Sequence, residues 1–181
     1  MMKKTVMTTL VIGSLALGGL LINQRGWSNQ VNRLATDEIK ELVSSYTYQQ
    51  KSSNEVAYID SNVLTIVQGD QTGVEYELPK DEFFVSIAPY YGITHPCATH
   101  YLTGCNSELK NEEFGIIIKD MDGNVIIDET KTSQPNGFID LWLPRDKEYT
   151  IQITHNGNII NSTLSTFEGD NTCITTPLQF G

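Results

Sequence analysis

The feature that most constrains this chain is a dense group of thiol and imidazole side chains. Two of the three cysteines and two of the three histidines lie within the eleven residues from His95 to Cys105. The third cysteine, Cys173, lies near the C-terminus. A fold that uses the cysteines together must therefore hold this group on a stable body and bring the C-terminal segment back to it.

The odd number of cysteines limits the covalent options. An exported protein with a disulfide framework normally carries an even number, so at least one of the three thiols is free or all three share another role. Soft thiolates favour Cu(I), and an imidazole from His95 or His100 can complete such a site. Three cysteines and one histidine also suit Zn(II). The residues alone leave open a Cys97–Cys105 disulfide with Cys173 buried and unused.

The N-terminus has the pattern of an export signal. Residues 1–4 carry two lysines, and residues 5–22 contain no charged side chain. The apolar run is close to the lower limit of a membrane span, and no clear cleavage site follows it. We therefore predict that residues 1–27 are a signal peptide or an uncleaved N-terminal membrane anchor, and that the rest of the chain is exported.

The charge of the exported part argues against nucleic acid as a partner. Removing residues 1–27 takes away Lys3, Lys4 and Arg25, which leaves nine of the twelve basic residues against 22 acidic ones. The formal charge becomes −13 instead of −10. No basic stripe remains that could contact a phosphate backbone, and the acidic balance suits a soluble exported protein.

The later sequence predicts one helix followed by short strands. Residues 29–50 have partly helical apolar spacing, and a lone amphipathic helix must cover a sheet or pair with a partner, so we consider it a candidate for dimerisation. Asp-Gly at 122–123 and Asn-Gly at 156–157 predict tight hairpins. Strands are predicted at 56–59, 63–67, 74–78, 83–87, 114–118, 125–127, 138–143, 149–153 and 158–166.

These elements predict an α+β fold with two parts after the export signal. Residues 28–90 form the N-terminal part, a helix with short strands. Residues 91–181 form an antiparallel, β-sandwich-like domain that carries the cysteine site, because strands about ten residues apart with turns between them are typical of a sandwich or barrel.

The cysteine segments resemble those of the CueP-type bacterial copper-binding proteins. The shared motifs are His95-Pro96-Cys97-x-x-His100-x4-Cys105 and Thr172-Cys173-x-Thr175-Thr176-Pro177-Leu178. The resemblance is close over about residues 84–181 and looser over the N-terminal part. It implies an extracytoplasmic protein that binds copper through Cys97, Cys105 and Cys173 and acts in copper resistance, storage or delivery. The resemblance also implies a dimer formed through the N-terminal part. Reduction of Cu(II) is a further activity that the resemblance suggests.

We therefore predict a copper-binding protein, not an enzyme, in the periplasm or at the outer face of the cytoplasmic membrane. Cys97, Cys105 and Cys173 sequester Cu(I), with His95 or His100 as a fourth ligand or as support, and copper is preferred to zinc. The expected partners are the copper ion, a copper-accepting protein and a second copy of the chain. The alternative is a metal-free surface β-sandwich that acts as an interaction module and has one structural disulfide. A thiol–disulfide enzyme is disfavoured because the chain has no C-x-x-C motif.

Overall fold

A computed structural model describes residues 31–49 and 54–181 as one helix and three β-sheets. Residues 1–27, the predicted signal peptide or anchor, lie outside the described residues. The N-terminal elements are β1 (Val31–Asn32), α1 (Thr36–Gln49), β2 (Glu55–Ile59), β3 (Val63–Gln68), β4 (Gly73–Glu77), β5 (Glu82–Ile87) and β6 (His100–Tyr101). The later strands are β7 (Glu113–Asp120), β8 (Val125–Thr132), β9 (Ile139–Pro144), β10 (Glu148–His155), β11 (Asn158–Ser165) and β12 (Cys173–Ile174).

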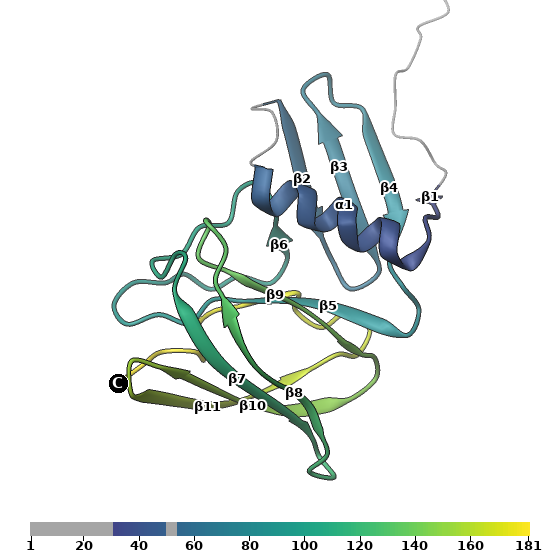
Figure 1. Cartoon of the computed structure of the whole chain (residues 1–181). Helices are drawn as coiled ribbons and strands as arrows, with labels where there is room; N and C mark the ends of the chain where they lie inside the picture. Colours follow the sequence, from purple (N-terminus) through teal and green to yellow (C-terminus); the bar gives the residue numbers. More distant parts are fainter. Residues whose placement is uncertain (1–30, 50–53) are drawn as a thin grey trace, which may run out of the picture.

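The elements stack in layers, as Figure 1 shows. Helix α1 lies across a five-stranded sheet with the order β1-β4-β3-β2-β6. Below it, a three-stranded sheet with the order β12-β5-β9 faces a four-stranded sheet with the order β11-β10-β7-β8. The predicted α+β class is confirmed, but β5, the middle strand of the three-stranded sheet, comes from the predicted N-terminal part, residues 28–90.

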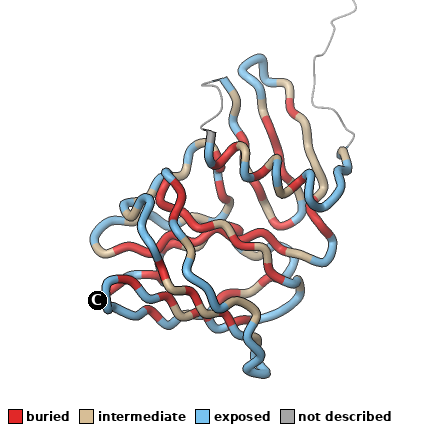
Figure 2. Tube along the Cα trace, in the orientation of Figure 1, coloured by how far each residue is buried: buried red, intermediate tan, exposed pale blue. Residues whose placement is uncertain are grey.

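Strand β5 has both of its faces buried and so separates two hydrophobic clusters. Phe83, Val85 and Ile87 pack into the core between the two lower sheets. Phe84, on the opposite face of the strand, packs into the cluster that also contains Ile39 of α1. Figure 2 shows the same layering, with the buried positions gathered where the sheets face each other and the helix. A continuous apolar run is what a strand buried on both faces requires.

The structure corrects the start of the predicted helix. Val31 and Asn32 form β1, which runs parallel to β4, and α1 begins only at Thr36. The Glu38 carboxylate accepts a hydrogen bond from the backbone N–H of Ala35 at 2.9 Å, which caps the first turn in the manner of a capping box. Residues 29, 30 and 50 of the prediction lie outside the described residues.

All nine predicted strands are present, with ends that differ from the structure by a few residues. The predicted hairpins are also confirmed, between β7 and β8 and between β10 and β11. Gly123, Asn156 and Gly157 have positive φ angles of 86°, 48° and 82°, which is the backbone conformation that Asp-Gly and Asn-Gly turns need.

Strands that precede residue 90 pair with strands that follow it, in two of the three sheets. Strand β5, which precedes this position, pairs antiparallel with β9 over six residues. Strand β6, which follows it, pairs with β2 of the five-stranded sheet, with Ile59 opposite His100. The loop that carries Cys97 therefore runs from the sandwich to the five-stranded sheet. Within residues 31–49 and 54–181, no helix has the length and apolarity to cross a membrane.

Candidate metal centre

Three cysteine sulfurs converge at one point. Cys97 lies in the loop between β5 and β6, Cys105 follows β6, and Cys173 begins β12. Their Sγ atoms all lie within 4.8 Å of one another, and those of Cys97 and Cys105 are 3.9 Å apart. All three are free thiols, so the Cys97–Cys105 disulfide that the sequence left open is absent. Three sulfurs bound to one ion at about 2.3 Å in a plane are about 4 Å apart, so the observed spacing suits a single ion.

Cys173 reaches the other two cysteines because β12 is added to β5. Cys173 lies opposite Ser86 in a parallel pairing, and the Ser86 N–H donates to the carbonyl of Thr172 at 2.8 Å. The backbone N–H groups of Thr172 and Cys173 both donate to the carbonyl of Ala98, at 2.9 and 3.2 Å. Since Ala98 directly follows Cys97, these bonds hold two of the cysteine segments against each other.

Two threonine hydroxyl groups add further links. The buried Thr172 hydroxyl accepts a hydrogen bond from the His100 N–H at 3.1 Å and donates one to the Ile59 carbonyl at 2.6 Å. The Thr175 hydroxyl donates to the His95 carbonyl at 2.7 Å. The C-terminal segment is therefore tied to the loop on both sides of Cys97 and to β2 of the five-stranded sheet.

A tight turn places Cys105 beside Tyr101. The N–H groups of Gly104 and Cys105 donate to the Tyr101 carbonyl at 3.1 and 2.8 Å. In return, the Tyr101 N–H donates to the Cys105 sulfur at 3.3 Å. Cys97 differs, because its thiol donates to the Thr99 carbonyl at 3.3 Å. Cys105 thus receives hydrogen bonds that favour a thiolate, whereas Cys97 makes one that requires the proton.

The three thiols consequently ionise unequally. A hydrogen bond from the Cys173 thiol is the main cause that lowers the pKa of Cys105 to about 4; burial opposes this, and the nearby His100 ring supports it. The same contact with Cys105, together with burial, raises the pKa of Cys173. Burial raises the pKa of Cys97. Near neutral pH the cluster carries one thiolate, at Cys105, so binding an ion through three thiolates must release two further protons.

His100 is fully buried beside the cluster. Neither of its ring nitrogens has a hydrogen-bond partner among the described residues. The ring packs against Phe138, with centroids 4.7 Å apart, and against Phe84, at 6.0 Å, and it lies near enough to Cys105 to lower the pKa of that thiol. A buried imidazole without partners is unfavourable unless another group completes it. An ion held by the adjacent sulfurs would be such a group.

His95 has a different environment. It is exposed, and its Nδ1 atom lies 3.4 Å from the carbonyl oxygen of Pro96. With Cys97 and Cys105 it lines an open depression of about 510 Å³, whereas Cys173 is only 1% exposed. The structure thus brings together the three predicted cysteines and His100, and it places His95 at the rim.

Sequence reasoning missed the groups that fix this geometry, because they have no metal-ligand signature. Thr172 and Thr175 stood in the motif only as neighbours of Cys173. Glu108 was not considered at all, although its carboxylate accepts hydrogen bonds from the backbone N–H groups of residues 91–93 and so fixes the start of the cysteine loop. The two threonines beside a cysteine in a polar tail were the available signal for a segment that folds back.

Comparison with known proteins agrees with this site. A family described as "Periplasmic copper-binding protein CueP" matches residues 38–178. A solved structure described as "Crystal Structure of S.CueP" is similar with a TM-score of 0.74 and 32% sequence identity, over 79% of this chain and 88% of that one. No curated protein sequence matches. The family match spans every cysteine and His100, and the chain belongs to the CueP family of periplasmic copper-binding proteins.

Proposed function

We propose that the protein sequesters Cu(I) with the thiolates of Cys97, Cys105 and Cys173. The observation that carries this proposal is the convergence of the three sulfurs to within 4.8 Å. Soft thiolates prefer Cu(I), which supports copper over zinc as the bound ion. We assign His100, rather than His95, as the fourth ligand or the group that supports the thiolates, because its buried ring nitrogens have no partner in the described part of the chain.

An anaerobic titration with a coloured Cu(I) chelator as competitor tests the proposal. Cys97→Ser, Cys105→Ser and Cys173→Ser should each weaken Cu(I) binding by more than about 100-fold, since even a group that only supports a ligand is worth 10- to 100-fold. Met121→Leu is the control, because it removes a soft sulfur from an exposed turn. If Cys173→Ser binds Cu(I) as tightly as the wild type, the three-thiolate site is wrong.

We also propose that the thiols can reduce Cu(II), and that a chain oxidised in this way keeps one thiol and no longer holds Cu(I) in the three-thiolate site. Cys97 and Cys105 are near enough to form a disulfide after a small movement, since their sulfurs are 3.9 Å apart. Their oxidation to a disulfide gives one electron to each of two Cu(II) ions and releases one proton, from Cys97, because Cys105 is already a thiolate near neutral pH. Free thiols, counted after Cu(II) is added and copper is removed by a chelator, should fall from three to one per chain. A count that stays at three refutes the reduction.

The predicted partners remain proposals. Ile39, Val43 and Tyr46 on α1 are buried against the chain's own sheet, so a homodimer would have to form through a surface other than this apolar face of the helix. Sedimentation equilibrium tests the dimer directly. A copper-accepting protein would approach the depression at Cys97 and Cys105, because both of these thiols are partly exposed.

A further inference from the structure

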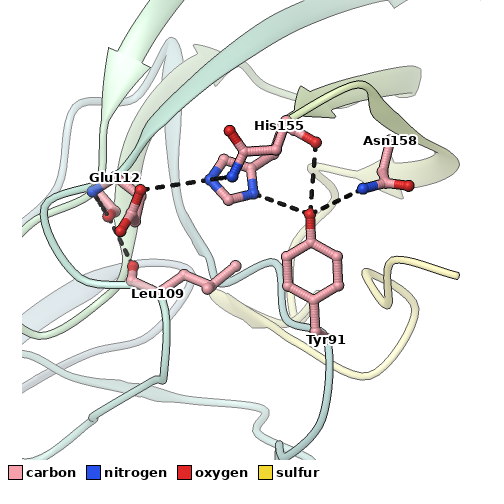
Figure 3. A network of polar contacts seen from close by, with 7 residues as sticks. Tyr91, Leu109, Glu112, His155 and Asn158 are labelled. Carbon is pink, nitrogen blue, oxygen red and sulfur yellow. Dashed lines mark hydrogen bonds and ion pairs between the residues drawn. The ribbon is translucent and has the colours of Figure 1, made fainter.

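A polar network centred on the half-buried Tyr91 and the buried His155 lies outside the cysteine cluster (Figure 3). The Tyr91 hydroxyl lies 3.1 Å from His155 Nδ1 and 3.5 Å from the His155 carbonyl oxygen, and it accepts a hydrogen bond from the Asn158 amide at 3.1 Å. On the other side of the ring, His155 Nε2 lies 3.3 Å from the Asn156 amide nitrogen and 3.5 Å from a carboxylate oxygen of Glu112. His155 is only 5% exposed, and its ring stacks on Phe114 with centroids 4.6 Å apart.

The contact between the Tyr91 hydroxyl and His155 Nδ1 is compatible with both protonation states of His155. In the neutral form Nδ1 either donates to or accepts from the Tyr91 hydroxyl, while Nε2 lies beside the Asn156 amide N–H, which can only donate, and the Glu112 carboxylate, which can only accept. In the charged form both ring nitrogens donate, so the Tyr91 oxygen accepts from Nδ1 and its O–H turns to the His155 carbonyl. The Asn158 amide donates to the Tyr91 oxygen in either state. The Tyr91 hydroxyl therefore has an acceptor in each state.

The surroundings of the ring also accommodate the charge. Glu112, which precedes β7 and is half exposed, supplies the opposite charge. The other neighbours of the ring are uncharged. They come from the loop after β5, from β7, from the β10–β11 hairpin and from the C-terminal segment, and they are Tyr91, Phe114, Asn156, Asn158 and Phe180. Protonation therefore forms an ion pair with a carboxylate that still contacts water, rather than an isolated buried charge.

Tyr91 also connects the three segments that carry the cysteines. It lies in the loop that leads to the first cysteine. Its backbone N–H donates to the carboxylate of Glu108, in the segment that follows the second cysteine. Its ring stacks on Phe180, with centroids 4.9 Å apart, and its carbonyl accepts a hydrogen bond from the Gln179 amide at 3.1 Å. Phe180 and Gln179 belong to the C-terminal segment that continues from the third cysteine.

We propose that Tyr91 and His155 are positioning residues for copper binding. Their contact holds the three cysteine segments in the relative position that the sulfur cluster requires, and it does so whether His155 is neutral or charged. This inference rests on the proposed Cu(I) site. Neither residue touches the ion, so both act through the segments that Tyr91 connects.

Tyr91→Phe tests the proposal, because it keeps the ring on Phe180 and removes only the hydroxyl. Loss of the contact should weaken Cu(I) binding by about fivefold to tenfold at pH 8, the equivalent of one buried hydrogen bond. Comparing the two proteins at the same pH cancels the competition between protons and copper for the thiols.

Tyr149→Phe is the matched control. Tyr149 is buried in the sandwich core, and its hydroxyl donates to the Pro144 carbonyl at 2.8 Å. It should lose a similar amount of folding stability and bind Cu(I) as the wild type does at each pH. Equal Cu(I) binding by Tyr91→Phe and the wild type at every pH overturns the inference. If the wild type itself fails to bind Cu(I), the proposed function fails instead.

Nitrogen NMR of the metal-free wild type provides a test that needs neither copper nor a variant. The expected result is a His155 Nδ1 that is hydrogen-bonded to the Tyr91 hydroxyl, together with nuclear Overhauser contacts between the Tyr91 and Phe180 rings. An Nδ1 without a hydrogen bond, or the absence of those contacts, contradicts the proposal.

Discussion

Thr172→Val removes the hydroxyl that joins the C-terminal segment to the rest of the site and changes little else in shape. In the folded protein this hydroxyl accepts a hydrogen bond from the His100 N–H at 3.1 Å and donates one to the Ile59 carbonyl at 2.6 Å. Thr172 is 1% exposed, so water cannot replace either bond. The substitution should therefore act both on stability and on the position of Cys173.

The expected size follows from these two bonds. Each is worth about 0.5–1.5 kcal/mol, and a buried donor or acceptor left without a partner costs about 1–3 kcal/mol. We expect Thr172→Val to lower the free energy of unfolding by about 2–4 kcal/mol. Cu(I) binding should weaken by about tenfold, which corresponds to about 1.4 kcal/mol, if one of the two bonds contributes to holding Cys173 at the cluster.

Urea denaturation and the competitive Cu(I) titration measure the two effects separately. Thr166→Val is the matched control, because Thr166 is also fully buried and its hydroxyl bonds to the carbonyls of Pro144 and Lys147, at 2.9 and 3.2 Å. It should lose comparable stability and keep its Cu(I) affinity. Thr172→Ser should keep most of the stability and most of the Cu(I) affinity of the wild type. If Thr172→Val and Thr166→Val bind Cu(I) equally well, the hydroxyl of Thr172 does not position the site.

Three further predictions follow from individual residues. Because the pKa of Cys105 is about 4, the metal-free protein should show the ultraviolet absorbance of one thiolate at pH 7. This absorbance should fall to half near pH 4 and be missing in Cys105→Ser. The stability that the thiolate provides should decline as the pH falls from about 9 to about 4. Partial desolvation raises the pKa of Glu108, but the hydrogen bonds from the N–H groups of residues 91–93 outweigh it and lower that pKa. Glu108→Gln should lower the free energy of unfolding by about 1 kcal/mol in urea denaturation at pH 7. The difference between the two proteins should vanish as the pH falls below the ordinary pKa of 4.5. Gly137→Ala should lower the free energy of unfolding by about 2–3 kcal/mol, because Gly137 has φ = +85° and a Cβ there would lie 2.8 Å from a backbone oxygen; an unchanged urea midpoint would contradict this.

The sequence was informative where structure depends on neighbouring residues. The long strands were predictable because β-branched and aromatic runs alternate with turn signals, and Asn156-Gly157 specifies its hairpin by local backbone preference. The two-residue strands β1, β6 and β12 were not predictable, since each exists only by pairing with a distant strand. The same cause shortened the predicted helix, because pairing with β4 overrides the helical pattern at Val31 and Asn32.

The candidate site divides in the same way. The cysteines could be identified from their type and their motif, but His95 and His100 were equivalent in the sequence because both lie close to Cys97. Tertiary pairing separates them: His100 lies on β6 against Ile59 and becomes fully buried, whereas His95 stays in an exposed loop. The role of the Thr172 hydroxyl was not predictable for the same reason, because its hydrogen-bond partners are distant in the sequence.

The most direct test of the central claim is X-ray absorption at the copper edge on protein loaded with one equivalent of Cu(I). Three thiolates around one ion predict three sulfur neighbours at a single distance, with any additional neighbour a nitrogen from His100. The Cys173→Ser variant should lose one sulfur neighbour. A wild-type spectrum with only two sulfur neighbours would contradict the account, because Cys97, Cys105 and Cys173 would then not hold the ion together.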